Sequence, residues 1–287
     1  MKHLFIIATL AVLLPSCIAD GTNYSTANDD TTSDTTAAKT SYTNEYKSTG
    51  DTSLLNVKLP QWITNQTLHY KAITVYFNNQ YRIPNCVAYE LTNTQVNMTD
   101  APDAENRDNY QFERDKNAEG CPDWWEYKNS EYDRGHMAPA MDMRWNATAM
   151  SQCFLMTNIC PQDHDLNDGE WRHMEEAIHH WAKSAERLVI FTGPVIERNM
   201  DKMGKKHNIA VPDEFFKVVY SPKHNRAIAF LFDNEMADKS WTNYAVTIDE
   251  VERVTGYDFL SALPDNVETD IESKENIKQW PKYFPRR

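Results

Sequence analysis

The chain has 287 residues, of which 41% are hydrophobic and 11% aromatic, enough to bury a sizeable core in one large domain or two small ones. The formal net charge of -13, taken for the whole chain, argues against a polyanionic partner. However, residues 130–226 hold 14 acidic and 12 basic residues and seven of the nine histidines, so the acidity of the flanks excludes nothing for this central segment.

The N-terminus has the pattern of an export signal. Lys2 and His3 precede an apolar run of 11 residues, Leu4 to Leu14, which is too short to span a bilayer and is typical of a signal peptide. Leu14-Pro15-Ser16-Cys17 resembles a bacterial lipobox, which predicts a lipoprotein-type signal peptide over 1–17 and a lipid anchor on Cys17. An ordinary cleaved signal peptide is the alternative. Both interpretations predict export, either as a lipoprotein of the cell envelope, facing the periplasm or the outside, or as a secreted protein.

Residues 18–54 are rich in Thr, Ser, Asn and Asp and have few large apolar side chains, which predicts a flexible tether. The predicted folded domain covers 55–287. Apart from Cys17, four cysteines remain, which is an even number for an oxidising compartment. Two disulfides in any of three pairings, or buried free thiols, fit Cys86, Cys121, Cys153 and Cys160.

The predicted elements follow in chain order. β-branched and aromatic residues predict strands over Tyr70–Phe77 and Cys86–Leu91, with a turn at Asn78-Asn79. Residues 97–131 are polar and are predicted to form a loop. A short strand is predicted over Phe154–Thr157.

The second half of the chain mixes helices and strands. Apolar residues at helical spacing predict a helix over Trp171–Arg187. A buried strand is predicted next, over Leu188–Thr192, closed by Gly193-Pro194. Hairpin strands over Phe215–Tyr220 and Arg226–Phe232, then a helix over Thr247–Thr255 that stops at Gly256, complete the pattern. Because strands and helices do not alternate strictly, we expect an α+β fold with a largely antiparallel central sheet flanked by helices.

The residues with chemical potential gather in the middle of the chain. Asp133-Arg134-Gly135-His136 is followed by Asn158-Ile159-Cys160-Pro161-Gln162, then by Leu166-Asn167 and Glu175. A phosphodiester-cleaving enzyme needs a base to activate water and a cation to stabilise charge on the phosphate and the leaving oxygen. These residue types can supply both requirements.

Three linked motifs carry a family resemblance. They are Asp-Arg-Gly-His, Asn-x-x-Pro-Gln and Leu-Asn-x-x-x-Trp-x-x-x-Glu, with nine positions from Asn158 to Asn167 and eight from Asn167 to Glu175. In order and spacing they resemble the DNA/RNA non-specific endonucleases of the ββα-metal (His-Me finger) type, close to the endonuclease G branch. The resemblance extends over roughly residues 56–264 and implies a ββα-metal motif at the active site.

The resemblance also implies roles for individual residues. His136 would be the general base, as suits a side chain that titrates near neutral pH. Asn167 would bind one Mg2+ through its side-chain oxygen, and Glu175 would hold metal-bound water. Asn158 would fix the geometry beside the histidine. Mn2+ or Ca2+ would also suit these ligands.

Basic residues are candidates for contacts with the phosphate backbone. Arg134 would contact the substrate phosphate or support the site, and a further catalytic arginine in the preceding loop would be Arg107, with Arg114 as a rival. Lys205 and Lys206 lie in the densest basic run, and they form either a charged loop or a substrate-binding arm. His173, His179 and His180 lack the pattern of a zinc site and are assigned to a solvated helix face.

We therefore expect an exported endonuclease that hydrolyses DNA and RNA with little sequence preference, using a His-activated water and one Mg2+. A nucleic-acid-binding surface lipoprotein with weak or no catalysis is an alternative, and a phosphodiesterase for small nucleotides is another. Some relatives form homodimers, and the resemblance leaves the oligomeric state of this chain open.

Overall fold

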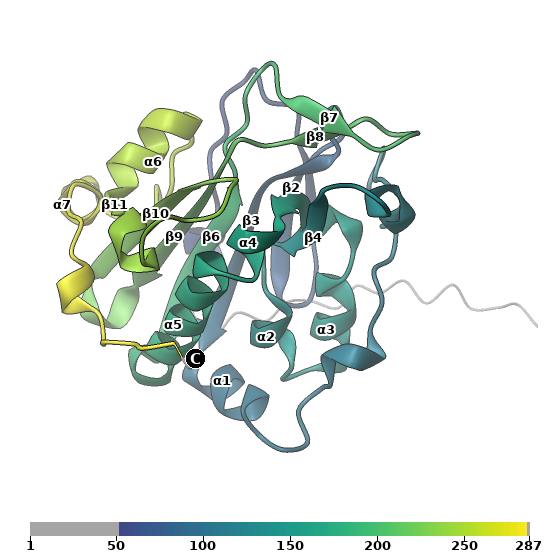
Figure 1. Ribbon diagram of the computed structural model, residues 1–287. Coiled ribbons are helices and arrows are strands. Elements are labelled where there is room, and N and C mark those ends of the chain that lie inside the picture. The colour runs from purple at the N-terminus through teal and green to yellow at the C-terminus, as the bar shows by residue number, and fades with distance from the viewer. Residues whose placement is uncertain (1–51, 286–287) are drawn as a thin grey trace, which may run out of the picture. The chain divides into compact units, whose positions relative to one another are not determined.

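The computed structural model describes residues 52–285 (Figure 1). The predicted signal peptide, its Cys17 and residues 18–51 of the predicted tether lie outside the described residues. Within 52–285, no helix combines the length and the apolar character needed to cross a bilayer.

A seven-stranded sheet forms the centre of the described region, in the order β1-β2-β3-β6-β9-β10-β11. Every neighbouring pair in it is antiparallel, which confirms the predicted α+β class with an antiparallel sheet. Its strands are β1 Gln66–His69, β2 Ile73–Asn78, β3 Ile83–Thr92, β6 Arg187–Pro194, β9 Glu214–Ser221, β10 Arg226–Asp233 and β11 Ala245–Val246.

The middle strands are covered on both faces, which explains their continuous apolar runs. On β9, the ring of Phe215 packs against Trp171 at a centroid distance of 5.7 Å, whereas the next residue, Phe216, packs against Tyr257 and Phe259 at 5.9 and 5.6 Å. Successive side chains of a strand point to opposite faces. One face of the sheet is therefore covered by the helix that carries Trp171, and the other by the segment that carries Tyr257 and Phe259.

The described residues form seven α-helices. Figure 1 shows them packed around the sheet. They are α1 Asn93–Thr99, α2 Ala140–Met143, α3 Ala147–Cys153, α4 His164–Asn167, α5 Glu170–Ala185, α6 Ile248–Thr255 and α7 Asp265–Glu272. Two of them confirm predicted helices. The predicted helix over Trp171–Arg187 is α5, and the predicted helix over Thr247–Thr255 is α6, with Thr247 as its N-cap and Gly256 in the left-handed conformation at φ 71°.

Two small two-stranded sheets lie apart from the large one. β4, Tyr132–His136, pairs with β5, Ile159–Asp163, and β7, Asp201–Met203, pairs with β8, Ile209–Val211. Figure 1 shows α4 between β4 and α5, so the β4–β5 hairpin and the helices after it follow one another in space as well as in sequence.

Some predicted boundaries are wrong. Phe154–Thr157 is not a strand, because Phe154 caps α3 and a 3-10 helix follows over Met156–Asn158 before β5 begins. The predicted strand over Tyr70–Phe77 begins only at Ile73, since Tyr70 N–H donates to Ile73 O at 2.9 Å and closes a turn after β1. The predicted strand over Leu188–Thr192 continues through Gly193-Pro194, because both residues still pair with β9, and β6 ends at Pro194.

Candidate active site

The β4–β5 hairpin, α4 and α5 carry the motif residues. Asp133 to His136 lie on β4, and β5 runs antiparallel to it, with Gly135 opposite Cys160 and His136 opposite Ile159. Asn167 is the last residue of α4, and Glu175 lies in the second turn of α5. This succession of two strands and a helix is the ββα arrangement that the sequence predicts.

Gly135 is required by the close approach of the two strands. A Cβ at this position would lie 2.2 Å from Gln162 Oε1 and 2.6 Å from Gln162 Cβ, far inside van der Waals contact. Gln162 is fully buried and its amide has no hydrogen-bond partner among the described residues. The glycine therefore lets a buried amide lie flat across β4 between Arg134 and His136.

His136 lies in an aromatic enclosure. Its ring is 5.2 Å from the ring of Phe112 and 4.9 Å, edge to face, from that of Phe154. Its Nε2 is buried and has no hydrogen-bond partner in the part of the chain that the structure describes. Burial lowers the pKa of His136 to about 3, and the positive charges of Arg107 and Arg134 add to the effect. The imidazole is therefore neutral at neutral pH, as a general base must be before it accepts a proton.

Two arginines flank this enclosure. The guanidinium of Arg134 lies 4.5 Å from the centroid of the Phe112 ring, and that of Arg107 lies 5.7 Å from the centroid of the Phe154 ring. The structure thus places both cations against the rings that contact His136. Arg114, the rival of Arg107, lies 4.0 Å from Asp123 Oδ2 instead.

Asn158 supports the chain that follows His136. Its Oδ1 accepts from Ala138 N–H at 2.9 Å, and its Nδ2 donates to Ala138 O at 2.9 Å and to Cys153 O at 2.8 Å. Its backbone carbonyl also accepts from Met137 N–H at 2.9 Å. The side chain is fully buried and its amide is engaged at both ends, so it holds the backbone beside His136.

Asn167 is oriented by the first residue of the tetrapeptide. Its Nδ2 donates to Asp133 Oδ2 at 2.9 Å, and His164 Nδ1 lies 2.9 Å from the same oxygen. Because the amide nitrogen is bound to a carboxylate, the amide oxygen is the atom left to face a cation. Asp133 therefore ties the proposed metal ligand to the strand that carries His136.

Glu175 is paired with a residue that the sequence analysis did not single out. Lys217 Nζ lies 2.7 Å from Glu175 Oε1, 3.5 Å from Met137 O, and 4.7 Å from the centroid of the Trp171 ring. Lys217 is buried. Burial raises the pKa of Glu175 to about 6, although the nearby Lys217 lowers it. A lone lysine within the apolar run of β9 was the signal in the sequence that could have found this residue.

These side chains suit a hard cation. One amide oxygen of Asn167 and one carboxylate, that of Glu175, are oxygen donors of the type that Mg2+ prefers, and Mg2+ usually keeps several of its waters. The unpartnered Nε2 of His136 leaves a proton acceptor on the strand to which Asn167 is bound. Asn167 would hold the ion, and Glu175 would hold water bound to it.

Lys205 and Lys206 lie in the loop between β7 and β8 and do not contact the motif residues. Lys205 lines an open surface pocket of about 660 Å³ that reaches Tyr132, the first residue of β4. Lys206 Nζ is exposed and lies 3.9 Å from Asp123 Oδ2. The basic loop is therefore at the edge of the hairpin that carries the motif, where it can extend a substrate-binding surface.

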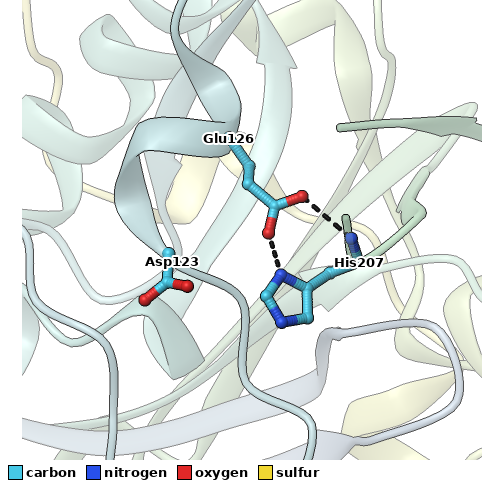
Figure 2. Close-up of side chains that lie close together, drawn as sticks. All are labelled: Asp123, Glu126 and His207. Atoms are coloured by element: carbon cyan, nitrogen blue, oxygen red, sulfur yellow. Dashed lines mark hydrogen bonds and ion pairs between the residues drawn. The ribbon is translucent and has the colours of Figure 1, made fainter. Parts of the chain in front are cut away.

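Glu126 holds this loop in place (Figure 2). Its Oε2 accepts from the backbone N–H groups of Lys206 and His207, each at 2.9 Å, and its Oε1 contacts Nδ1 of the His207 ring. Asp123 lies beside the pair, so the three side chains have the types and spacing of a metal site. Because both oxygens of Glu126 are already engaged, we interpret the group as an anchor for the loop.

The remaining histidine and cysteine predictions have mixed outcomes. The assignment of His179 to a solvated helix face is wrong, since it is buried with Nδ1 2.7 Å from Asp142 Oδ1. His180 is exposed and His173 is partly exposed. Of the two alternatives for the cysteines, two disulfides or buried free thiols, the structure shows the second, since Cys86, Cys121, Cys153 and Cys160 are free and buried.

Several known proteins are similar to most of this chain. The model of the family described as DNA/RNA non-specific endonuclease matches residues 50–266. A nuclease of Nostoc sp. is 33% identical over 218 residues, which cover 69% of this chain and 74% of the relative. A nuclease of Serratia marcescens is 29% identical over 225 residues, which cover 75% of this chain and 82% of the relative.

A solved structure shares the fold. A chain in the crystal structure of an EndoG/EndoGI complex superposes with a TM-score of 0.66 at 22% sequence identity. The match covers 76% of this chain and 95% of that chain, so nearly the whole of the solved chain has a counterpart here.

Proposed function

Because the chain belongs to the DNA/RNA non-specific endonuclease family, we propose that it cleaves nucleic-acid backbones with a water molecule activated by His136 and one Mg2+. The chain is a metal-dependent endonuclease of DNA and RNA. The observation that carries the proposed mechanism is the hydrogen bond from Asn167 Nδ2 to Asp133, since it aligns an amide oxygen with the strand of the general base.

His136 takes a proton from the attacking water. The neutral imidazole has an unpartnered Nε2, and the surrounding rings of Phe112 and Phe154 restrict its movement. Asn158 accepts from the N–H of Ala138 and donates to its carbonyl, which fixes the backbone that follows His136. A base that is already neutral and held in place needs little rearrangement before proton transfer.

Arg134 and Arg107 bind the scissile phosphate. Both guanidinium groups lie against the aromatic enclosure of His136, and the planar fork of arginine matches two phosphate oxygens. Contacts of this kind position the strand without reading bases, which supports cleavage with little sequence preference.

Asn167 would hold the cation, and Glu175, kept in place by Lys217, would orient water bound to it. The bound ion would neutralise charge on the phosphate and the leaving oxygen. Oxygen donors with several retained waters favour Mg2+, while Mn2+ and Ca2+ are accepted by the same donor types. Lys205 and Lys206 extend the phosphate-binding surface beyond β4.

Nicking of supercoiled plasmid tests the mechanism. We expect the wild type to cut in Mg2+ and to stop in EDTA, and His136→Ala to lose about 10²–10⁴-fold in rate, the range of general-base contributions. His180→Ala, which changes an exposed histidine of α5, is the matched control and should keep full activity. Wild-type cutting that persists in EDTA, or a His136→Ala variant as active as the control, would refute the proposal.

Cleavage assays with different nucleic acids test the substrate range. Long duplex DNA, single-stranded DNA and RNA are all expected to be cut, because the proposed contacts are to phosphates. Rapid hydrolysis of dinucleotides with little cleavage of long strands would instead favour a small-nucleotide phosphodiesterase.

Export as a lipoprotein is proposed from the sequence of residues 1–17 alone. The expected result is that the protein fractionates with membranes and that Cys17→Ser releases it. Release without loss of export would identify Cys17 as the anchor, whereas an unchanged membrane fraction would contradict lipidation. The resemblance leaves the oligomeric state open between a monomer and a homodimer, and light scattering of the purified protein would distinguish the two.

A further inference from the structure

Three carboxylates from α6 and α7 converge on the side of the large sheet that lies away from α5. Asp249 and Glu252 are one helical turn apart on α6, and Glu272 is the last residue of α7. One carboxylate oxygen of each lies within 4.8 Å of the others. Figure 1 shows the two helices side by side next to β10. Glu272 follows the segment matched by the family model, which ends at residue 266.

Glu272 is the unusual member of this cluster. It is only 6% exposed, and its Oε1 is buried with no hydrogen-bond partner within 52–285. A buried carboxylate without a partner is costly, because its desolvation is not compensated. Its neighbour Ile271 is buried in the core and fixes the end of α7, so the carboxyl group cannot easily turn out to solvent.

The surroundings of Glu272 make its ionisation harder still. The charges that act most strongly on its carboxyl group are those of Glu252, Glu268, Asp249 and Asp258, and all are negative. Burial and these charges raise the pKa of Glu272 to about 8. Lys58 Nζ lies 2.8 Å from Asp258 Oδ2 and is engaged there. The cluster therefore needs either a proton or a cation.

The geometry points to a structural binding site for a hard divalent cation, of the Ca2+ class, formed by Asp249, Glu252 and Glu272. Ca2+ binds carboxylate oxygens at about 2.3–2.6 Å, so oxygens within 4.8 Å of one another can share one ion. Glu252 Oε1 also accepts from Phe259 N–H at 2.8 Å, which orients its carboxylate toward the cluster. The ion would join α6 to α7 and so hold the C-terminal helix on the sheet. The site is separate from the proposed catalytic cation of Asn167.

The test uses the Asn167→Ala variant, which lacks the proposed ligand of the catalytic cation. Isothermal titration of Asn167→Ala with CaCl2 should still show one bound ion, and adding Glu272→Gln should abolish it. Asp270→Asn removes a charge from the same helix at an exposed residue paired with Lys274 and is the matched control, with binding unchanged. Plasmid nicking by Glu272→Gln in Mg2+ should match the wild type.

Thermal unfolding gives a second readout. We expect the melting temperature of the wild type to rise by several degrees in CaCl2 relative to EGTA, and that of Glu272→Gln to be the same in both. If Glu272→Gln does not fold, the exposed Asp249→Asn should weaken calcium binding about tenfold in the Asn167→Ala background. The proposal is overturned if Asn167→Ala binds no calcium. It is also overturned if Glu272→Gln has a higher melting temperature than the wild type, by the same amount in CaCl2 and in EGTA. That result would show that a proton, and not a cation, occupies the cluster.

Discussion

Lys217 shows how a single buried cation can organise the proposed active site. It is 1% exposed, and its ammonium group joins Glu175 on α5 to the carbonyl of Met137, the residue after His136. The two ends of the ββα motif are therefore connected through a strand of the large sheet. A charge this deep is stable only when it is paired, so the lysine and the glutamate depend on each other.

Lys217→Met should uncover this dependence. Loss of one partner from a buried ion pair costs about 3–5 kcal/mol, so we expect a large fall in the free energy of unfolding, measured in urea. Nicking in Mg2+ should fall about 10–100-fold, as for other residues that support a metal ligand. Lys217→Met/Glu175→Gln should recover much of the stability but not the activity. A double variant no more stable than Lys217→Met would contradict this pairing.

The pH dependence of stability tests whether His179 is charged in the folded protein. Burial lowers the pKa of His179, but the hydrogen bond to Asp142 and the charges of Asp142 and Asp100 raise it above its ordinary value. A raised pKa in the folded state contributes stability that is fully present below the unfolded value of about 6.5 and is lost as pH rises through the folded value. His179→Gln should therefore lower the melting temperature more at pH 5.5 than at pH 9. An equal loss at both pH values would show that His179 is not charged in the fold.

At the scale of elements, the β4–β5 hairpin is held together by a contact that only glycine permits. Gly135→Ala would drive a methyl group into Gln162, and overpacking of this kind costs about 1–3 kcal/mol. We expect a lower melting temperature and weaker nicking, because the distortion falls one residue before His136. Gly135→Ala/Gln162→Ala removes the obstructing side chain and should restore part of the stability. If the double variant is no more stable than Gly135→Ala, the requirement for glycine at position 135 comes from the strand geometry and not from the contact with Gln162.

The elements themselves were predictable to an unequal degree. α5 and α6 follow from helical spacing and end signals, and β9 and β10 from dense apolar runs, because local pattern and burial agree there. The short apolar run Phe154–Thr157 predicts a strand that the structure does not have. The chain turns there because Asn158 bonds across it to Cys153 and Ala138, a long-range effect that no local pattern contains.

At the scale of the whole molecule, substrate binding has to overcome a net charge of -13. Arg107 and Arg134 supply positive charge at the site, because they lie against the rings that contact His136. Each phosphate contact contributes about -0.9 to the slope of log affinity against log salt for duplex DNA. Local cations, not the overall charge, should therefore set the salt dependence.

DNA binding by the inactive His136→Ala protein measures this directly. Arg107→Ala should reduce the salt slope by about 0.9 and weaken binding to unrelated sequences alike, because the contact is to phosphate. Arg114→Ala is the matched control, since that arginine lies against Asp123, and its slope should not change. The reverse result would assign the phosphate contact to Arg114.

The site was predictable in its residues but not in its connections. The motif spacing identified His136, Asn167 and Glu175 as candidates, yet nothing in it linked Asp133 to Asn167 or Lys217 to Glu175. Asp133 and Asn167 are 34 positions apart and are linked between β4 and α4. Glu175 and Lys217 are 42 positions apart and are linked between α5 and β9. Such pairings depend on how elements pack, which a single sequence does not reveal.

The four free cysteines of the described region can report when the fold opens locally, because each of them is buried. Burial raises the pKa of Cys121 to about 12 and holds the pKa values of the other three thiols above their ordinary range, so little reactive thiolate forms while the domain is closed. A maleimide can then modify only molecules that have transiently unfolded around a given cysteine. The labelling rate of each thiol would time the opening of its own neighbourhood, from the central strand at Cys86 to the catalytic hairpin at Cys160.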